Sequence, residues 1–210
     1  AKIIVNDEGK AIDVKLRNRG CGENLIEDFM IVANETVATH IYFMDLPFIY
    51  RVHGEPNEEK IMNFLRFVNI LGYKINGKIT KITPKAMQDL LNQLKGKKQF
   101  HLLSGLLLRS MQKAVYSDKN IGHFGIASKC YTHFTSPIRR YPDTTVHRLL
   151  HTYIFSQELD SDTIDYWTKD LPFIALETSN AERLAIECER EVDDMKMAEY
   201  MQEHIGEEYE

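Results

Sequence analysis

The chain has 210 residues, of which 43% are hydrophobic and 10% aromatic, and its formal net charge at pH 7 is −5. This composition is typical of a soluble globular domain with a core of its own, and no apolar run approaches the roughly 20 residues that a membrane-spanning helix needs. A protein that coats duplex DNA usually has a basic surface, which this composition does not favour. An enzyme that holds a nucleic acid in a narrow channel can still be acidic overall.

The cysteines give no sign of a disulfide framework. Cys21, Cys130 and Cys188 lie far apart, and an odd number without a CxxC pair argues against disulfides and against a zinc site. Residues 1–5 are too short and unflanked for a signal peptide. We therefore expect thiols without a disulfide partner, no membrane association and a cytoplasmic location.

The N-terminal part of the chain is predicted to form a hairpin and a helix. Residues 2–5 and 11–17 have strand patterns on either side of a turn-forming stretch, 6–10. Over 23–44 apolar residues recur at every fourth position, which indicates an amphipathic helix. Pro47 ends this pattern, and 48–53 is expected to be extended.

Three further helices are expected in the middle of the chain. Asn57 is a suitable N-cap for a helix over 57–69. A loop over 72–77 has a glycine at each end. The next helix, 83–96, begins with a threonine cap and a proline at the first helical position, and a fourth covers 100–112.

The C-terminal part is predicted to contain short extended segments and a long helix. Residues 113–118 and 124–134 have extended patterns. A Ser-Pro helix start follows at 136–137, and because Pro142 lies five residues later the helix either kinks there or begins there. An acidic linker around 160–162 precedes a long helix over about 173–205. The expected fold class is α+β, predominantly helical with a few strands.

The densest group of candidate functional residues lies at 131–143. Arg139 and Arg140 are adjacent in the first turn after the predicted helix start, where exposed N–H groups and the helix dipole favour an anion. Arginine adds permanently charged, bidentate donors that fit a phosphate. Nearby aromatic residues, Tyr131, Phe134 and Tyr141, could stack on bases or sugars. The alternative is a solvated helix face, with one of the arginines paired with Asp143.

Two groups of carboxylates form further candidates. In the last helix, Glu182, Glu189 and Asp193 share a face next to an apolar stripe, and they could hold a ribose hydroxyl, an arginine or a metal-bound water. In the first helix the candidate pair is Glu27 and Asp28, of which Glu27 lies roughly opposite the apolar face. A solvated, charged helix face is the alternative for both groups.

A weaker candidate pair is Arg51 with His53, although a histidine beside a turn is more often structural. The sequence has no glycine-rich phosphate loop, HExxH or GxSxG motif, and no set of residues with metal-ligand spacing. No metal ligand is therefore expected within this chain.

Several blocks of sequence resemble the RNB catalytic domain of exoribonucleases of the RNase II and RNase R types. The most specific are 122–127 (GHFGIA), 131–143 (YTHFTSPIRRYPD) and 147–150 (HRLL). Blocks at 25–35 and 181–192 follow the same order as in the family. The resemblance covers essentially the whole chain and is closest to the bacterial RNase R branch.

The resemblance implies processive degradation of single-stranded RNA from the 3′ end to 5′-mononucleotides, with Mg²⁺. Arg139 matches the arginine that contacts phosphate near the scissile bond and supports cleavage. Glu189 matches a glutamate that anchors the 3′-terminal nucleotide, and Glu27 matches a glutamate lining the same cavity. Four neighbouring side chains are further candidates for RNA contact: His133, Ser136, Arg140 and Tyr141.

The sequence also departs from the family pattern. The family's magnesium site is a cluster of aspartates early in the domain, and no such cluster occurs in this chain. We therefore expect residues 1–210 to be the C-terminal portion of an RNB catalytic domain, with the aspartate cluster and the flanking oligonucleotide-binding domains outside it. The isolated chain is expected to be inactive and to expose core surface. The alternative is a non-catalytic RNA-binding or scaffold protein derived from the same domain.

Overall fold

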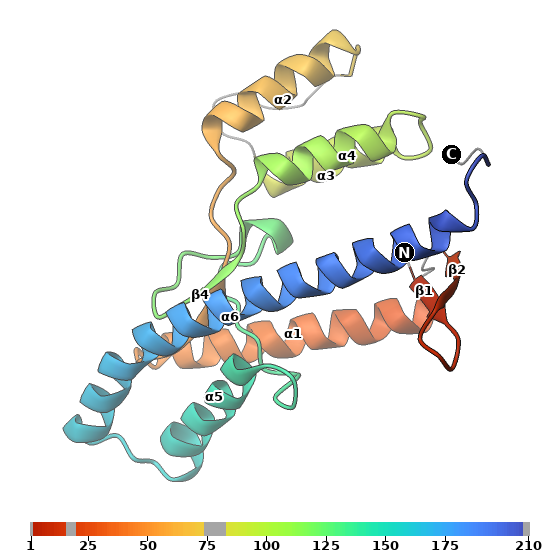
Figure 1. Cartoon of the computed structure of the whole chain (residues 1–210). Coiled ribbons are helices and arrows are strands. Elements are labelled where there is room, and N and C mark those ends of the chain that lie inside the picture. The colour runs from red at the N-terminus through yellow and green to blue at the C-terminus, as the bar shows by residue number, and fades with distance from the viewer. Residues whose placement is uncertain (1, 16–19, 74–82, 208–210) are drawn as a thin grey trace. The chain divides into compact units, whose positions relative to one another are not determined.

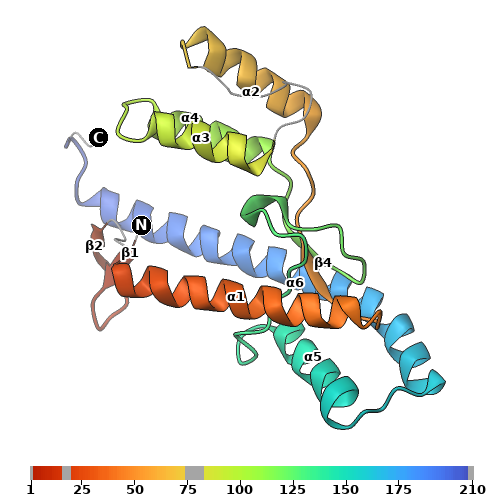
Figure 2. The ribbon, with the colours of Figure 1, turned by 180° about the vertical axis from the view of Figure 1, so that it is seen from behind.

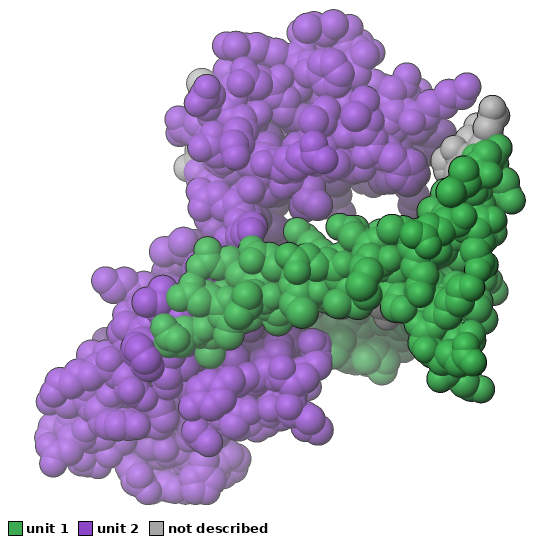
Figure 3. Space-filling model, in the orientation of Figure 1, with its two compact units in different colours: residues 1–31, 177–210 green, residues 32–176 purple. Residues whose placement is uncertain are grey.

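A computed structural model describes residues 2–15, 20–73 and 83–207. It divides into two compact units, one of residues 1–31 with 177–210 and one of residues 32–176, which are coloured separately in Figure 3. The positions of the two units relative to each other are not determined. None of the described helices is long and apolar enough to cross a membrane. Two predicted segments extend outside the described residues, namely the end of the second strand at 16–17 and most of the 72–77 loop.

The first unit begins with a β-hairpin. Strands β1 (Lys2–Val5) and β2 (Ala11–Lys15) pair antiparallel, as predicted. The Asn6 side chain accepts hydrogen bonds from two backbone N–H groups of the turn, at 3.1 and 2.9 Å. Gly9 has a φ of 78°, which a residue with a side chain rarely adopts. The turn chemistry read from the sequence therefore fixes the hairpin register.

The hairpin is tied to the end of the long helix α6 (Ser161–Gln202), within the same unit. The Lys196 ammonium donates a 2.6 Å hydrogen bond to the Gly9 carbonyl. The Ala11 N–H donates to the Glu199 carboxylate at 3.2 Å. The strands are short and largely uncovered, so these polar contacts position the hairpin on the helix.

Helix α1 (Cys21–Phe43) continues from the first unit into the second, and its apolar face is buried only in the second. Ala38 and Ile41 have no solvent exposure. In the first unit, Leu25 and Phe29 from the predicted stripe are 54% and 63% exposed. The helix is where the sequence predicted it, and among the described residues the N-terminal part of its apolar stripe is exposed.

The main core lies in the second unit. Strand β3 (Tyr50–Val52) pairs antiparallel with β4 (Val115–Ser117), and helix α5 (Tyr141–Leu150) packs with them against the ends of α1 and α6. A π-helical turn at His151–Phe155 follows α5. The largest fully buried side chains of this core are Ile41, Phe48, Ile49, Val146, Leu149, Tyr153 and Leu171.

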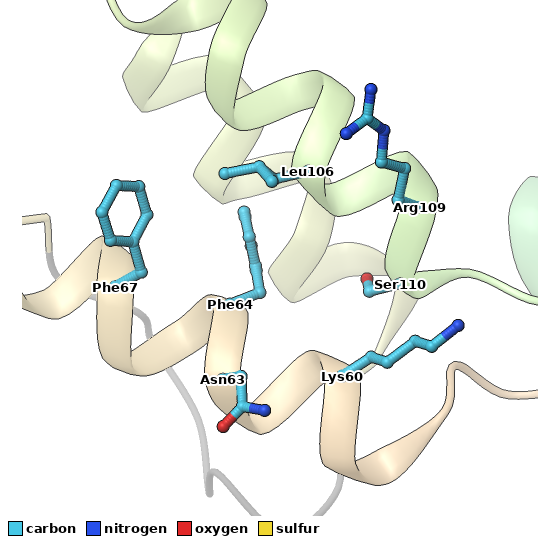
Figure 4. A pocket seen from close by; sticks show the side chains of 7 residues that line it. All are labelled: Lys60, Asn63, Phe64, Phe67, Leu106, Arg109 and Ser110. Carbon is cyan, nitrogen blue, oxygen red and sulfur yellow. The ribbon is translucent and has the colours of Figure 1, made fainter.

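Helices α2 (Glu58–Ile70), α3 (Pro84–Leu94) and α4 (Phe100–Ser110) enclose a second core cluster. Figures 1 and 2 show α3 and α4 side by side. The predicted caps are confirmed: Asn57 accepts from the Lys60 N–H at 3.0 Å, and the Thr83 hydroxyl accepts from the Ala86 N–H at 3.2 Å. Between α2 and α4 lies a groove of about 460 Å³, with an apolar floor and the cationic side chains of Lys60 and Arg109 (Figure 4).

One predicted element, the extended segment at 124–134, is wrong. Phe124–Ile126 forms a single 3₁₀ turn, and residues 127–134 are irregular. The turn ends at Ala127, whose φ of 56° lies in the left-handed region. Here tertiary contacts override the extended pattern of the sequence.

The long C-terminal helix begins at Ser161, twelve residues before its predicted start at about 173. The expected acidic linker is its N-cap, because the Asp160 carboxylate accepts from both the N–H (3.0 Å) and the hydroxyl (2.9 Å) of Thr163. Pro172 lies inside this helix, one residue before the predicted start. The α+β class, predominantly helical, is confirmed.

Candidate functional site

The loop at 134–140 is held against the first turns of α5. Asp143, at the start of α5, has no solvent exposure. Its Oδ1 accepts hydrogen bonds from the Ser136 N–H and from the Arg140 guanidinium, each at 2.8 Å. A carboxylate in this first turn also interacts favourably with the helix dipole. The question left open by the sequence is thereby answered, because Arg140 and not Arg139 pairs with Asp143.

A short turn lies between these two anchored residues. The N–H groups of Arg139 and Arg140 both donate to the Ser136 carbonyl, at 3.3 and 3.2 Å. The Thr144 hydroxyl donates to the Pro137 carbonyl at 2.7 Å and ties the turn to α5 a second time. Helix α5 therefore begins at Tyr141, after the turn, with Pro142 in its first turn. The sequence left open a kink or a start at Pro142, and the start is correct.

The base of the loop is held from two further sides. The imidazole of His147 stacks on the Phe134 ring, with centroids 4.4 Å apart, and its Nε2 lies 2.9 Å from the Phe134 carbonyl oxygen. The buried Asn34 side chain accepts from the Phe134 N–H at 2.9 Å and donates to the Tyr131 hydroxyl at 3.0 Å. The backbone that carries the two arginines is thus fixed by three helical residues of α5 and one of α1.

The tip of the loop points into solvent. Ile138 is fully exposed and Arg139 is exposed, whereas the Arg140 side chain is only 19% exposed. Tyr141 is about half exposed, and the Arg148 guanidinium lies 5.8 Å from its ring centroid. Arg139 and Tyr141 therefore offer a cation and an aromatic ring on the same exposed stretch.

A layer of histidine and tyrosine side chains lies beneath the loop. Arg51 and Tyr116 are paired across β3 and β4, and the guanidinium lies 4.6 Å from the ring centroid. The Tyr116 hydroxyl is 2.7 Å from the Nδ1 of His133. Burial, helped by the charges of nearby arginines, lowers the pKa of His133 to about 3, so this ring is neutral at physiological pH.

His53 has a structural role, as the sequence analysis favoured. Its Nδ1 accepts from the Gly125 N–H at 2.8 Å, and its Nε2 lies 2.7 Å from the Gln112 carbonyl. These contacts assign the proton to Nε2. Burial, together with the charges of His53 and Arg51, lowers the pKa of the neighbouring His123 to about 4. The rings of His123 and His133 are therefore neutral at neutral pH.

The carboxylate candidates lie in the other unit. Glu27 is half-buried on α1, and Glu189 is exposed on α6. Because the relative position of the units is not determined, neither carboxylate is placed with respect to Arg139. The apolar stripe beside Glu189 is also exposed, with Leu184 at 70% and Met195 at 57%.

The described residues do not form a magnesium site. Within 2–15, 20–73 and 83–207, no group of three or more His, Cys, Asp or Glu side chains could hold a metal ion. The buried thiol of Cys130 has its pKa raised by burial to about 11, which makes it a poor nucleophile and ligand at neutral pH.

Sequence reasoning missed the residues that hold the loop. Asn34, Thr144 and His147 were not singled out for this role, and Asp143 was considered only as a possible ion-pair partner. Their hydrogen bonds are made with residues between 3 and 100 positions away in the chain. A helical periodicity gives no signal for such contacts, apart from the position of Asp143 in the first turn of a helix.

The fold and this loop define a mostly helical domain that presents an arginine and an aromatic ring from a rigid support, which is a surface suited to an anionic polymer. The model of the family described as "RNB domain" matches residues 1–156, and the chain therefore belongs to that family.

Curated relatives agree with this assignment. Ribonuclease R 1 of Lactococcus lactis is 48% identical over 210 residues, which are 100% of this chain and 26% of that protein. Ribonuclease R of Thermotoga maritima is 46% identical over 208 residues, which are 98% of this chain and 29% of that protein. The chain thus spans less than a third of the length of these relatives.

Solved structures show the same relationship. The RNase R of Mycoplasma genitalium, in complex with ribose-methylated single-stranded RNA, superposes with a TM-score of 0.92 at 33% identity, over 98% of this chain and 32% of that one. Yeast Ssd1, described as a pseudonuclease, gives a TM-score of 0.60 at 26% identity, over 77% of this chain and 21% of that one. The resemblance to the RNB family and its RNase R branch is confirmed.

Proposed function

We propose that this chain is part of an RNase R-type exoribonuclease that degrades single-stranded RNA processively from the 3′ end to 5′-mononucleotides. The observation that carries the proposal is the exposed Arg139 at the tip of a loop fixed on all sides, in a chain of the RNB family. The complex of the Mycoplasma genitalium RNase R with single-stranded RNA supports the choice of substrate. A reducing, cytoplasmic setting is part of the same proposal.

Arg139 is proposed to contact the phosphate near the scissile bond. A fixed guanidinium offsets negative charge that grows on a phosphoryl group in the transition state. Tyr141 is exposed beside it and is suited to stack on a base or a sugar. Ser136, His133 and Arg140 were expected to contact RNA, and their hydrogen bonds support a role in shaping the loop that bears Arg139.

Glu189 is proposed to anchor the 3′-terminal nucleotide, and Glu27 is proposed to line the same cavity. Ionised carboxylates accept hydrogen bonds from ribose hydroxyls, and the 2′-hydroxyl distinguishes RNA from DNA. Both glutamates belong to one unit, on α1 and α6, which is consistent with a shared task.

Mg²⁺ is proposed to be the metal of the full-length enzyme, held mainly by aspartates outside this chain. When bound, it would supply charge stabilisation and an activated water. The described residues contain no candidate metal cluster, and the chain spans 26% of a Ribonuclease R relative. Residues 1–210 are therefore proposed to be the C-terminal portion of the catalytic domain, inactive in isolation.

The first experiment incubates 5′-labelled single-stranded RNA with Mg²⁺ and resolves the products on a gel. The full-length enzyme should shorten the RNA from its 3′ end, whereas the 210-residue chain should leave it intact. In the full-length enzyme, Arg139→Ala should lower kcat by about 10²–10³, the size of losing one oxyanion donor. Cleavage by the chain alone would contradict the proposed metal site, and an unchanged kcat would contradict the role of Arg139.

A second candidate function is RNA binding without cleavage. The structural similarity to yeast Ssd1, described as a pseudonuclease, favours it. Gel-shift binding of the same RNA by the full-length protein, with no product at any Mg²⁺ concentration, would establish this alternative. An aspartate cluster upstream of the chain, together with product formation, would eliminate it.

A further inference from the structure

One carboxylate oxygen holds both ends of the turn that carries Arg139. Oδ1 of Asp143 accepts from the Ser136 N–H and from the Arg140 guanidinium, each at 2.8 Å, and Asp143 is fully buried. The other oxygen of Asp143 and the Nε of Arg140 are buried without a partner among the described residues. The ion pair is therefore made through Oδ1 alone, and the same atom fixes the turn.

We infer that Asp143 is a positioning residue that sets the direction of Arg139 toward its phosphate, an inference that rests on the proposed function. Arg139 lies between the two residues that Asp143 anchors, and its N–H donates to the Ser136 carbonyl at 3.3 Å. With both ends held, the backbone at Arg139 has little freedom. A cation fixed before the substrate arrives costs less entropy when the transition state forms.

Asp143 also selects which arginine acts. It neutralises Arg140, whose side chain is 19% exposed, and leaves Arg139 as the exposed cation of the adjacent pair. A guanidinium already bound to a buried carboxylate would have to break that ion pair to reach a phosphate. The Asp143 carboxylate thus holds Arg140 inward, where it supports the loop, and leaves Arg139 exposed to contact the phosphate.

Asp143 acts on the turn and is not part of the apolar core. The core cluster around α5 contains apolar side chains such as Val146 and Leu149, and Asp143 is not a member of it. Thr144 ties the same turn by a hydrogen bond of 2.7 Å from its hydroxyl to the Pro137 carbonyl. Two neighbouring helix residues therefore hold one turn, and loss of either should act on Arg139.

A double-mutant cycle in the full-length enzyme tests the inference, with kcat and KM measured on 5′-labelled single-stranded RNA. Asp143→Asn keeps the volume and an acceptor oxygen but removes the charge that holds Arg140. It should lower kcat by about 10–100-fold with a smaller change in KM, because a misplacement of about 1 Å can cost 10²-fold. In an Arg139→Ala background, Asp143→Asn should lower kcat by less than about twofold, because residues that act through one another are not additive.

The control is Asp165→Asn, an exposed aspartate on α6, which should leave kcat unchanged in both backgrounds. If Asp143→Asn does not fold, Thr144→Val removes the second tie without touching the buried charge, and the same non-additive loss of kcat is expected. An equal loss of kcat in both backgrounds would overturn the inference and leave the proposed function intact. An unchanged kcat for Arg139→Ala alone would instead contradict the proposed function.

Discussion

The Arg140 guanidinium lies 2.8 Å from the fully buried carboxylate of Asp143, and this ion pair decides which of two adjacent arginines faces solvent. In the sequence the two arginines are equivalent candidates. In the structure Arg140 is part of the support and Arg139 is part of the surface. Replacing Arg140 should therefore change the free energy of unfolding by a different amount from replacing Arg139.

Arg140→Ala should destabilise the fold far more than Arg139→Ala. Removing Arg140 leaves a buried carboxylate without its cation, which typically costs about 3–5 kcal/mol. Arg139 is exposed, and its replacement should change stability by no more than about 0.5 kcal/mol. Urea unfolding of both variants measures the difference. Equal losses of stability would mean that the ion pair with Asp143 does not hold the loop.

The free energy of unfolding should decrease as the pH is lowered, over a range set by the pKa of His133 in the unfolded and folded states. Burial and nearby arginine charges lower the pKa of its ring from about 6.5 to about 3 in the folded state. Between these values the unfolded chain binds the proton and the folded chain does not, so acid favours unfolding. The contribution of this histidine is fully present above about pH 6.5 and declines as pH falls toward 3.

The measurement is the urea midpoint of unfolding at pH 7, 5.5 and 4.5. His133→Gln removes the titrating group while keeping a polar side chain near the Tyr116 hydroxyl, and it should flatten the decline between pH 7 and 4.5. His123 also has a lowered pKa, about 4, and should leave a residual slope. If the urea midpoint of His133→Gln declines with falling pH as steeply as that of the original chain, His133 is accessible to protons in the folded state.

Gly125→Ala should be destabilising although the glycine is exposed. An added Cβ would lie 3.1 Å from the Nδ1 of His53, closer than side-chain atoms usually approach. His53 cannot easily yield, because hydrogen bonds to Gly125 and Gln112 hold both of its ring nitrogens. We expect a loss of about 1–3 kcal/mol, the usual cost of overpacking.

Gly105→Ala is the matched control. It lies inside α4 with nothing within 4 Å of an added Cβ, so the substitution should stabilise the helix by about 0.5–1 kcal/mol. Thermal melts of the two variants should therefore shift in opposite directions. An unchanged melting temperature for Gly125→Ala would show that His53 moves at no cost in stability.

The isolated chain should associate through exposed apolar side chains of its first unit. Leu25, Ile26 and Phe29 on α1 are each more than half exposed, as is Leu184 on α6. Exposed apolar side chains in such number promote association in water. Dynamic light scattering should show species larger than a monomer, and Phe29→Glu should reduce their size. A clean monomer with a sharp melt would contradict this prediction.

Part of the fold could be predicted from the sequence because its causes are local. The caps at Asn57 and Thr83 act on N–H groups three residues away, so a short stretch of sequence contains both partners. The hairpin turn around Asn6 is local in the same way. The start of α6 was misplaced although its cap, Asp160, is also local, because the acidic stretch around 160–162 was interpreted as a linker.

Segments whose conformation depends on distant residues could not be predicted. Residues 124–134 have an extended pattern, yet the Phe124 N–H donates to the His53 carbonyl at 2.9 Å and His53 binds Gly125, more than 70 positions away in the chain. These bonds turn the chain instead of extending it. The same holds for the apolar stripe of α1, whose burial depends on what packs against each half.

The sequence by itself determined the family, the predominance of helices, and the stretch that bears the two arginines, because motif order and helical periodicity are written along the chain. Only the tertiary structure decided that Arg139 faces solvent while Arg140 supports the loop. Asp143 is three residues from one arginine and four from the other, so sequence spacing cannot choose between them. The choice follows from the burial of Asp143 at the start of α5, since a buried carboxylate needs a cation within hydrogen-bonding distance.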